Sequence, residues 1–386
     1  MQEFAQRVAE TEFPPIAEAF GWLAGRKSDK ELLNMCQAVP SYPPAPALQQ
    51  EIARLALEPG TGGYTDIFGI PELREGFARH LSADYAAPVA ARQVAITTGC
   101  NQAFAAAIMV LAQAGDNVVM PAPFYFNHQM WLRMMGVAIK PVNAFAAGGA
   151  PSVEESEAAI DGRTKAIMLC SPNNPSGAIY PPQVLEEFYE LAKRRGIALI
   201  IDETYKDFRP GHAPAHGILQ RDGWDETLIQ LFSFSKIYAL AGYRLGALVA
   251  GPKLLHEAAK VLDCMTICPP QITQRAVVFA LTQLDQWKEE KRQLMAGRLA
   301  ALREAFSDPR LKFRLVSSGA YFAYVQHPFT GEASKDVAKR LAQQHDVLCL
   351  PGSMFGPGQE NFLRFAFANV DKEKMALLVE RLVNSQ

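Results

Sequence analysis

The sequence predicts an α/β protein: a large domain built on a mostly parallel, roughly seven-stranded sheet flanked by helices, and a smaller α+β domain. Three observations predict this fold. Short apolar, β-branched segments alternate with amphipathic helical segments along most of the chain. The apolar segments are continuous rather than alternating, as in strands that are covered on both faces. After about residue 285 this alternation stops and a long, charged helical stretch begins.

Each apolar run is expected to form one strand of the large sheet. The runs cover residues 93–98, 117–120, 165–170, 197–201, 228–232 and 245–250, with a weaker one at 137–142. Between them lie helical segments such as 183–195, in which Val184, Leu185, Phe188 and Leu191 recur at helical spacing. Strand–helix alternation implies right-handed crossovers, so the ligand site should lie at the carboxyl ends of the strands.

The change of pattern near residue 285 predicts the domain division. We expect residues 45–285 to form the large domain, and residues 1–44 together with 286–386 to form the small one. In the C-terminal part, a helical stretch at 283–306 leads into strand-like segments at 313–316 and 321–325 and a helix at 334–344. A chain of 386 residues is also longer than one compact domain usually is.

The composition is that of an ordinary globular enzyme, with 49% hydrophobic and 20% charged residues. These values exclude a disordered chain, a collagen and a coiled coil. The net charge of −2 provides no global field that would attract nucleic acid or an anionic membrane, so neither is expected as a partner. The most apolar stretch, 103–112, is shorter than the roughly 20 residues that a bilayer requires and is expected to be a buried helix.

The N-terminus and the cysteines favour a cytoplasmic location. The first residues contain no basic segment followed by an apolar run, so no signal peptide is expected. The six cysteines are scattered, which argues against a disulfide framework. Cys264 and Cys268 are spaced like metal ligands, but no second pair or histidine cluster follows them, and no metal site is expected.

Polar side chains follow several of the expected strands. Asp202 comes directly after the run 197–201, and a turn rich in Asn, Pro and Gly at 171–177 follows the run 165–170. The segment Ser-Phe-Ser-Lys ends at Lys236, with Arg244 eight residues later, and Gly-Cys-Asn at 99–101 opens a helix. Taken singly, each has a simpler interpretation: a helix N-cap, turn chemistry, a solvated lysine or an ordinary strand-to-helix turn. Together they predict one functional edge of the sheet.

In this order and on these strand ends, the motifs resemble those of fold-type I pyridoxal-phosphate (PLP) enzymes, specifically the class I/II aminotransferase family. The resemblance extends from Tyr42 to Asn369 and is most diagnostic at Lys236 and Arg244. It implies PLP as cofactor and transfer of an amino group between an amino acid and a 2-oxo acid by a ping-pong mechanism. The intact motifs, Lys236 above all, argue against a non-catalytic ligand sensor.

The resemblance also implies roles around the cofactor ring. Lys236 would bind the PLP aldehyde covalently and then move the substrate proton, for which its pKa must be lowered by a cationic, partly desolvated pocket. Asp202 would sit beside the pyridine nitrogen and keep it protonated. Tyr205 and Asn174 would bond the phenolic oxygen of the ring. Because Tyr205 lies three residues beyond Asp202, one strand end can supply both groups.

The phosphate and the stacking face of the cofactor are assigned in the same way. Phosphate donors would be backbone amides at a helix start, two hydroxyls and a guanidinium: Gly99, Cys100, Asn101, Ser233, Ser235 and Arg244. Tyr125 matches the aromatic residue that family members stack on the cofactor, although a core aromatic is the simpler interpretation. Tyr64 matches the tyrosine that reaches the phosphate of the neighbouring subunit. This match implies a homodimer with shared active sites.

For the substrate, the resemblance implies that Arg364 grips the α-carboxylate, with Asn174 nearby, because a guanidinium fork matches a carboxylate. A structural ion pair is the alternative for Arg364. Ala38 stands where the family usually has glycine. Its methyl group could narrow the substrate mouth or alter domain closure, and we include it as a substrate-binding candidate.

Substrate preference and reaction type are less constrained. Dicarboxylate-specific members carry an arginine about six residues before a Pro-Pro pair, whereas Asp263 stands at that distance before Pro269. An aspartate cannot clamp a second carboxylate, so neutral, aromatic or even cationic donors are favoured over aspartate. A PLP-dependent lyase, cleaving a C–S bond or decarboxylating, needs the same Lys236, Asp202 and Arg244 and remains the alternative to transamination. The histidines, including His128, His212 and His216, form no evident constellation and are interpreted as structural or surface residues.

Overall fold

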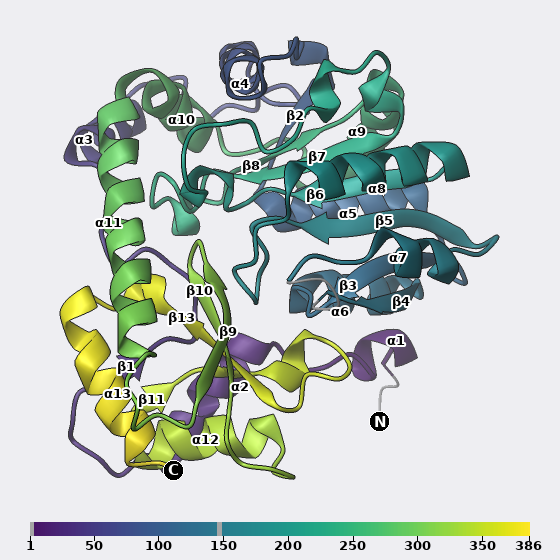
Figure 1. Ribbon diagram of the computed structural model, residues 1–386. Helices are drawn as coiled ribbons and strands as arrows, with labels where there is room; N and C mark the ends of the chain where they lie inside the picture. Colours follow the sequence, from purple (N-terminus) through teal and green to yellow (C-terminus); the bar gives the residue numbers. More distant parts are fainter. Residues whose placement is uncertain (1–3, 145–148) are drawn as a thin grey trace.

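The computed structural model describes residues 4–144 and 149–386. Its main feature is a seven-stranded sheet, called here the central sheet, with the order β2-β8-β7-β6-β5-β3-β4 (Figure 1). The strands are β2 (Val94–Thr97), β3 (Asn117–Ala122), β4 (Ala138–Asn143), β5 (Thr164–Cys170), β6 (Ala198–Asp202), β7 (Leu228–Ser233) and β8 (Gly246–Val249). Each expected strand of the large sheet is present, so the predicted α/β fold with about seven strands is confirmed.

One strand runs against the others. β8 pairs antiparallel with both β2 and β7, whereas the pairs β3–β4, β3–β5, β5–β6 and β6–β7 are parallel. The segment between β7 and β8 contains only the short 3₁₀ turn Ala241–Tyr243 and no crossover helix, so the chain returns in the opposite direction. This segment carries Lys236 and Arg244, and its reversal brings both to the carboxyl end of β7.

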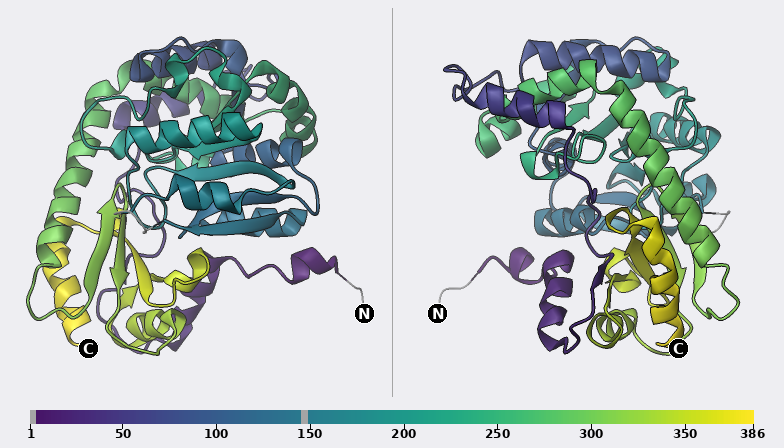
Figure 2. Two further views of the ribbon diagram at one scale, coloured as in Figure 1. Left: turned by 45° about the vertical axis from the view of Figure 1, so that its right-hand side comes forward. Right: turned by 90° about the vertical axis from the view of Figure 1, so that its left-hand side faces the viewer.

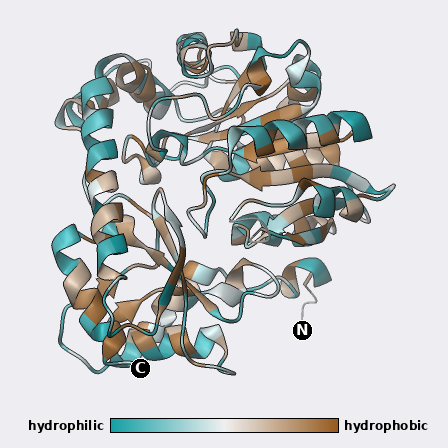
Figure 3. Cartoon of the chain, in the orientation of Figure 1, coloured by the Kyte–Doolittle hydropathy of each residue, from teal (hydrophilic) through white to brown (hydrophobic). Residues whose placement is uncertain are grey.

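The central sheet is covered by helices on both faces, and its buried residues alternate between the two cores. Val118, Met168 and Ile200 pack under α5 (Cys100–Leu111), α6 (Phe126–Met135) and α9 (Pro252–Thr266). Their neighbours Val119 and Leu169 point to the other face. The helices of that face are α3 (Pro46–Ala56), α4 (Pro71–Tyr85), α8 (Pro182–Arg195) and α10 (Gln271–Gln283). Figure 3 shows the apolar strands between helices whose outer sides are hydrophilic.

A second, smaller sheet has the order β12-β13-β10-β9 and is antiparallel throughout. Its strands are β9 (Arg314–Gly319), β10 (Phe322–Gln326), β12 (Leu350–Pro351) and β13 (Phe362–Ala366). The helices α2 (Pro15–Gly21), α12 (Ser334–Gln344) and α13 (Met375–Val383) surround it, and the long α11 (Asp285–Ala305) runs from the region of the central sheet down to this one (Figures 1 and 2).

The N-terminal segment joins both regions. β1 (Leu33–Asn34) pairs in parallel with β11 (Val347–Leu348), next to the small sheet. The short α1 (Gln6–Ala9) lies against α6, where Arg7 donates a hydrogen bond to the Met135 carbonyl. The division at residues 45 and 285 stays a prediction. Residues 1–3, which begin the segment searched for a leader peptide, lie outside the described residues.

The two sheets meet at the turn of the β9–β10 hairpin. There Gly319 packs directly on Gly177, backbone against backbone, with no room for a Cβ atom on either residue. The turn 171–177 and the small sheet are therefore in contact close to the ends of β5 and β6. Within residues 4–144 and 149–386, no helix has both the length and the apolar character that crossing a membrane requires.

Candidate active site

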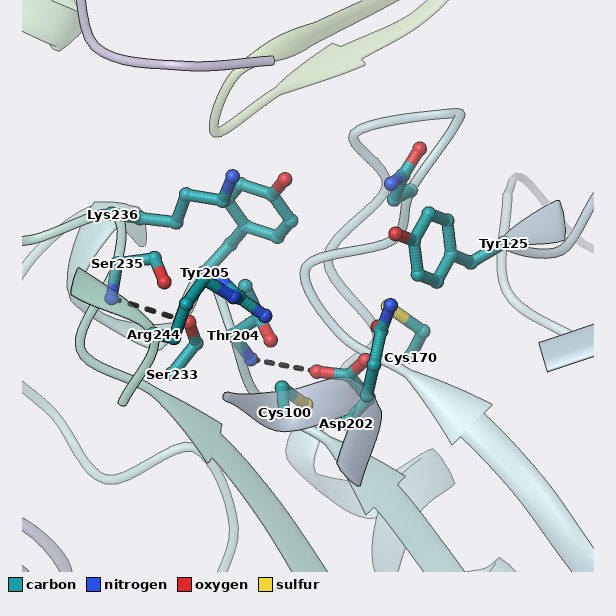
Figure 4. A pocket seen from close by; sticks show the side chains of 12 residues that line it. Cys100, Tyr125, Cys170, Asp202, Thr204, Tyr205, Ser233, Ser235, Lys236 and Arg244 are labelled. Carbon is teal, nitrogen blue, oxygen red and sulfur yellow. Dashed lines mark hydrogen bonds between the residues drawn. The ribbon is translucent and has the colours of Figure 1, made fainter. Parts of the chain in front are cut away.

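A cavity opens at the carboxyl ends of β5, β6 and β7, where the α5 helix begins. Figure 4 shows Lys236 and Tyr205 on one side of it, Tyr125 on the other, and Asp202 below them in this view. The residues that line it are Cys100, Asn101, Tyr125, Cys170, Asn174, Asp202, Thr204, Tyr205, Ser233, Ser235, Lys236 and Arg244. The cavity lies at the edge of the central sheet that the strand-end motifs indicated. Cys170 and Thr204 also line it, although the motifs assigned neither a role; Cys170 ends the apolar run 165–170, and Thr204 lies two residues beyond Asp202.

Lys236 is half-buried, and its surroundings make the charged amine unfavourable. The Nζ atom donates a hydrogen bond of 2.7 Å to the Ala38 carbonyl and lies 5.9 Å from the centre of the Tyr205 ring. Burial, and then the positive charges of Arg244 and Arg364, lower the pKa of Lys236 to about 8. This contact places the backbone of Ala38, where the sequence departs from the family pattern, beside Lys236, although Ala38 itself does not line the cavity.

Asp202 ends β6 and is held in one orientation. Its Oδ1 atom accepts a hydrogen bond of 2.9 Å from the backbone N–H of Thr204, and its Oδ2 atom lies 3.5 Å from Nε2 of His128. Both side chains are buried. Burial lowers the pKa of His128 to about 4, so the imidazole is neutral at pH 7.

From the sequence, His128 was interpreted as a structural or surface histidine that belongs to no group of functional residues. In the structure it is buried beside Asp202. It packs against Tyr125 and Phe104, with ring centres 5.1 and 4.2 Å away, and faces the carboxylate at the base of the cavity. The signal that could have found it is its spacing. His128 follows Tyr125 by three residues at the start of α6, so the two side chains lie on one face of the helix.

The end of the cavity near β7 is suited to an anion. α5 begins at Cys100, directly after Gly99, with its N-terminus at the cavity. The first backbone N–H groups of a helix have no partner within the helix and point out of its N-terminus. Gly99 has a φ of +84°, and a Cβ atom there would overlap the guanidinium of Arg244. The hydroxyls of Ser233 and Ser235 line the same end. This set of donors, a helix start with two hydroxyls and a guanidinium, fits a phosphate group.

Arg364 comes from β13 of the small sheet and is 1% exposed. Its Nη1 atom donates a hydrogen bond of 3.1 Å to Oδ1 of Asn174, and its Nη2 atom donates to the Cys36 carbonyl. Its Nε atom has no hydrogen-bond partner among the described residues. Burial lowers the pKa of this guanidinium below its ordinary value. A buried arginine that has no carboxylate partner among the residues described can bind the carboxylate of a substrate.

Some residues singled out in the sequence lie away from the cavity. Tyr64 is 81% exposed and Asp263 lies near the end of α9, and neither lines the cavity. His212 contacts Arg292, with 2.9 Å between Nδ1 and Nη1, and His216 packs on Tyr85 behind β6. Tyr125 does line the cavity, and burial raises its pKa to about 12, so its phenol is neutral.

Comparisons with known proteins give one consistent result. The family model described as aminotransferase class I and II matches residues 30–382. The chain is 29% identical over 368 residues to an aspartate aminotransferase of Thermotoga maritima, with 93% of each protein covered. It is 27% identical over 389 residues to an aromatic aminotransferase of Arabidopsis thaliana, with 98% of this chain and 95% of that protein covered.

Solved structures agree with the sequence comparison. The crystal structure of an aspartate aminotransferase from Thermotoga maritima matches with a TM-score of 0.89 at 27% identity, over 99% of both chains. The aspartate aminotransferase from Thermus thermophilus with maleate matches with a TM-score of 0.91 at 25% identity, over 100% of both chains. The chain therefore belongs to the class I and II aminotransferases, enzymes of fold type I that use pyridoxal phosphate to move an amino group between an amino acid and a 2-oxo acid.

Proposed function

We propose that this aminotransferase prefers neutral or aromatic amino donors to aspartate. The observation that carries the proposal is the charge inventory of the cavity. Among the described residues, the cations that line it are Lys236 and Arg244, with Arg364 at its border. Lys236 and Arg244 serve the cofactor and Arg364 the α-carboxylate, so the described residues that line the cavity leave no further cation for a second carboxylate. The curated relatives include both aspartate and aromatic aminotransferases, and their names do not decide the question.

In the proposed mechanism, bound PLP supplies the carbonyl group that takes up the amine and the electron sink that acidifies the substrate's α carbon. Lys236 would be the residue that holds PLP. Its Nζ atom, with a pKa of about 8, then takes the proton from the α carbon and later returns it. The Ala38 carbonyl, 2.7 Å from Nζ, orients the amine.

The remaining residues of the cavity would hold the cofactor and orient its ring. Asp202 would hold a proton at the ring nitrogen of PLP, and its own oxygens are placed by Thr204 and His128. Tyr205 and Asn174 would bond the phenolic oxygen, and Tyr125 would cover the ring. The phosphate is bound by the donors described at the anion end of the cavity: Gly99, Cys100, Asn101, Ser233, Ser235 and Arg244. Asp202, Tyr205 and Asn174 are buried, so they need little rearrangement during the reaction. Asn101 and Arg244, at the phosphate end, are exposed.

Arg364 binds the substrate's α-carboxylate through its planar fork, and this fixes the α hydrogen on the side of Lys236. Asn174 contacts both the cofactor and, through Arg364, the substrate end of the site. We further propose that residues 45–285 and the two flanking segments form the two domains of the enzyme. The α-carboxylate site then belongs to the small domain and the cofactor site to the large one.

We also propose a homodimer with shared active sites, located in the cytoplasm. The support for the dimer is the loop that carries Tyr64, which is 81% exposed. The loop is fixed on α10, since Thr65 accepts a hydrogen bond of 3.1 Å from Gln274. A fixed loop that presents a large aromatic ring to solvent suits a contact with a second copy of the chain. The scattered, reduced cysteines support the location.

A donor screen tests the substrate preference. The PLP form is mixed with phenylalanine, leucine or aspartate, and kcat/KM for each is measured with pyruvate and with 2-oxoglutarate as acceptors. We expect phenylalanine or leucine to exceed aspartate by about tenfold or more, the effect of one missing charge-assisted contact. A higher kcat/KM for aspartate would show that a cation from elsewhere, such as the partner subunit, completes the site.

A further inference from the structure

Two phenylalanine rings pack against the guanidinium of Arg364. The Cζ atom lies 5.2 Å from the centre of the Phe322 ring and 5.1 Å from the centre of the Phe355 ring. Phe322 begins β10, and Phe355 ends a 3₁₀ turn that follows β12, so the two rings come from different elements. Both rings are fully buried.

The rings restrain the guanidinium where hydrogen bonds do not. The two hydrogen bonds to Asn174 and to the Cys36 carbonyl fix its Nη atoms, but Nε has no partner among the described residues. A long side chain held at one end can still tilt out of its plane. An aromatic ring attracts a cation over its face and blocks this tilt. The hydrogen bonds set the in-plane direction of the fork, and the rings set the plane.

Phe355 also connects this site to the cofactor side of the cavity. Its carbonyl accepts a hydrogen bond of 2.9 Å from the backbone N–H of Phe124, the residue before Tyr125. A Cβ atom on the next residue, Gly356, would be only 2.9 Å from the Phe124 ring, so the two segments are in close contact. The backbone of Phe355 is therefore tied to the segment that follows β3 of the central sheet.

We propose that Phe355, assisted by Phe322, is a positioning residue that holds the Arg364 guanidinium in the plane required to bind the substrate's carboxylate. This inference rests on the proposed carboxylate-binding role of Arg364. Phe355 acts through Arg364. Removing its ring should weaken recognition of a carboxylate more than recognition of the rest of the substrate, because the ring orients the cation and does not contact the amine.

The test compares two donors that differ only in the carboxylate: phenylalanine and 2-phenylethylamine. Their dissociation constants are measured with the PLP-loaded enzyme from the absorbance change on mixing. Phe355→Met removes the ring and keeps most of the buried volume. We expect the preference for phenylalanine over 2-phenylethylamine to fall about tenfold, which corresponds to about 1.4 kcal/mol. Phe322→Met should lower it in the same direction and provides a second, independent variant.

Phe365→Met is the matched control. Phe365 follows Arg364 on β13 and is as deeply buried, but it points to the opposite face of the strand and packs on Phe306. We expect this variant to lose stability without changing the preference. If Phe355→Met and Phe322→Met leave the preference at the level of Phe365→Met, the positioning role is wrong. Arg364→Ala tests the carboxylate site independently of the positioning role of Phe355. If Arg364→Ala leaves the preference for phenylalanine intact, the proposed carboxylate site itself is wrong.

Discussion

The Nε2 atom of His128 lies 3.5 Å from the Oδ2 atom of Asp202, and both side chains are buried at the base of the cavity. The carboxylate thus has a polar neighbour on each oxygen, because Oδ1 accepts a hydrogen bond from Thr204. Neither neighbour carries a charge, since burial keeps the pKa of His128 at about 4. The negative charge of Asp202 is therefore oriented without being neutralised, and it stays available to a cationic group in the cavity.

Asp202→Asn keeps the shape of the side chain and removes this charge. We expect single-turnover transamination to slow by about 10²- to 10³-fold, the loss typical of removing one preorganised electrostatic group. The rate is measured by stopped-flow absorbance with a saturating amino donor. His128→Asn is the companion variant and should slow the reaction less, because the charge of Asp202 remains. A rate for Asp202→Asn within about threefold of the wild type would contradict the assigned role, since one electrostatic group should cost far more.

Lys236 should react as an uncharged amine near neutral pH. In the cofactor-free protein its pKa of about 8 predicts that acylation of Nζ rises to half its maximum near pH 8. Competitive labelling with acetic anhydride followed by mass spectrometry measures this, and the exposed Lys312 in the same digest serves as an internal reference. Labelling that rises only above pH 10, the range of an ordinary lysine, would show that the pocket does not depress this pKa.

The lowered pKa of Lys236 also makes the free energy of unfolding depend on pH. The folded-state pKa of Lys236, about 8, is below the unfolded-state value, so the unfolded protein binds more protons between these two values. The stability of the cofactor-free protein should therefore rise with pH from about 8 toward 10.5, the ordinary pKa of lysine. Lys236→Met should flatten that rise. Urea unfolding at several pH values compares the two slopes.

Sequence patterns predicted the elements and the edge at which the site lies, because both depend on local periodicity. Continuous apolar runs indicated strands with two covered faces, and polar residues followed them, Asp202 directly and Lys236 a few residues later. The direction of β8 was not predictable, since a strand buried on both faces has the same pattern in either direction. Contacts between segments that are distant in the sequence could not be predicted from local patterns either. His128 meets Asp202, and Phe355 meets Arg364, only through the tertiary fold.

The contact between Gly177 and Gly319 should limit substitution at the meeting point of the two sheets. Gly177 has a φ of +70°, and a Cβ atom there would overlap the backbone of Gly319 and Phe322. We expect Gly177→Ala to cost about 1–2 kcal/mol for the left-handed conformation alone, and more for the overlap. It should also lower kcat/KM, because the turn 171–177 carries Asn174.

Gly196→Ala is the matched control for this prediction. Gly196 has a φ of +64° but no other group within 4 Å of its would-be Cβ atom, so it bears the conformational cost without the overlap. Urea unfolding and steady-state kinetics are measured for both variants. Equal losses of unfolding free energy and unchanged kcat/KM for Gly177→Ala would show that the two sheets separate freely at this point.

Tyr64 provides the sharpest test of shared active sites, because its phenol lies outside its own cavity. A dimer that combines a Tyr64→Ala subunit with a Lys236→Ala subunit would contain one site with both residues intact if Tyr64 serves the neighbouring phosphate. Mixing the two inactive or weakened proteins under conditions that exchange subunits should therefore restore activity and tight cofactor binding. If each chain uses its own Tyr64, or if the protein is a monomer of 42.4 kDa by sedimentation, mixing restores nothing, because no site then contains both residues.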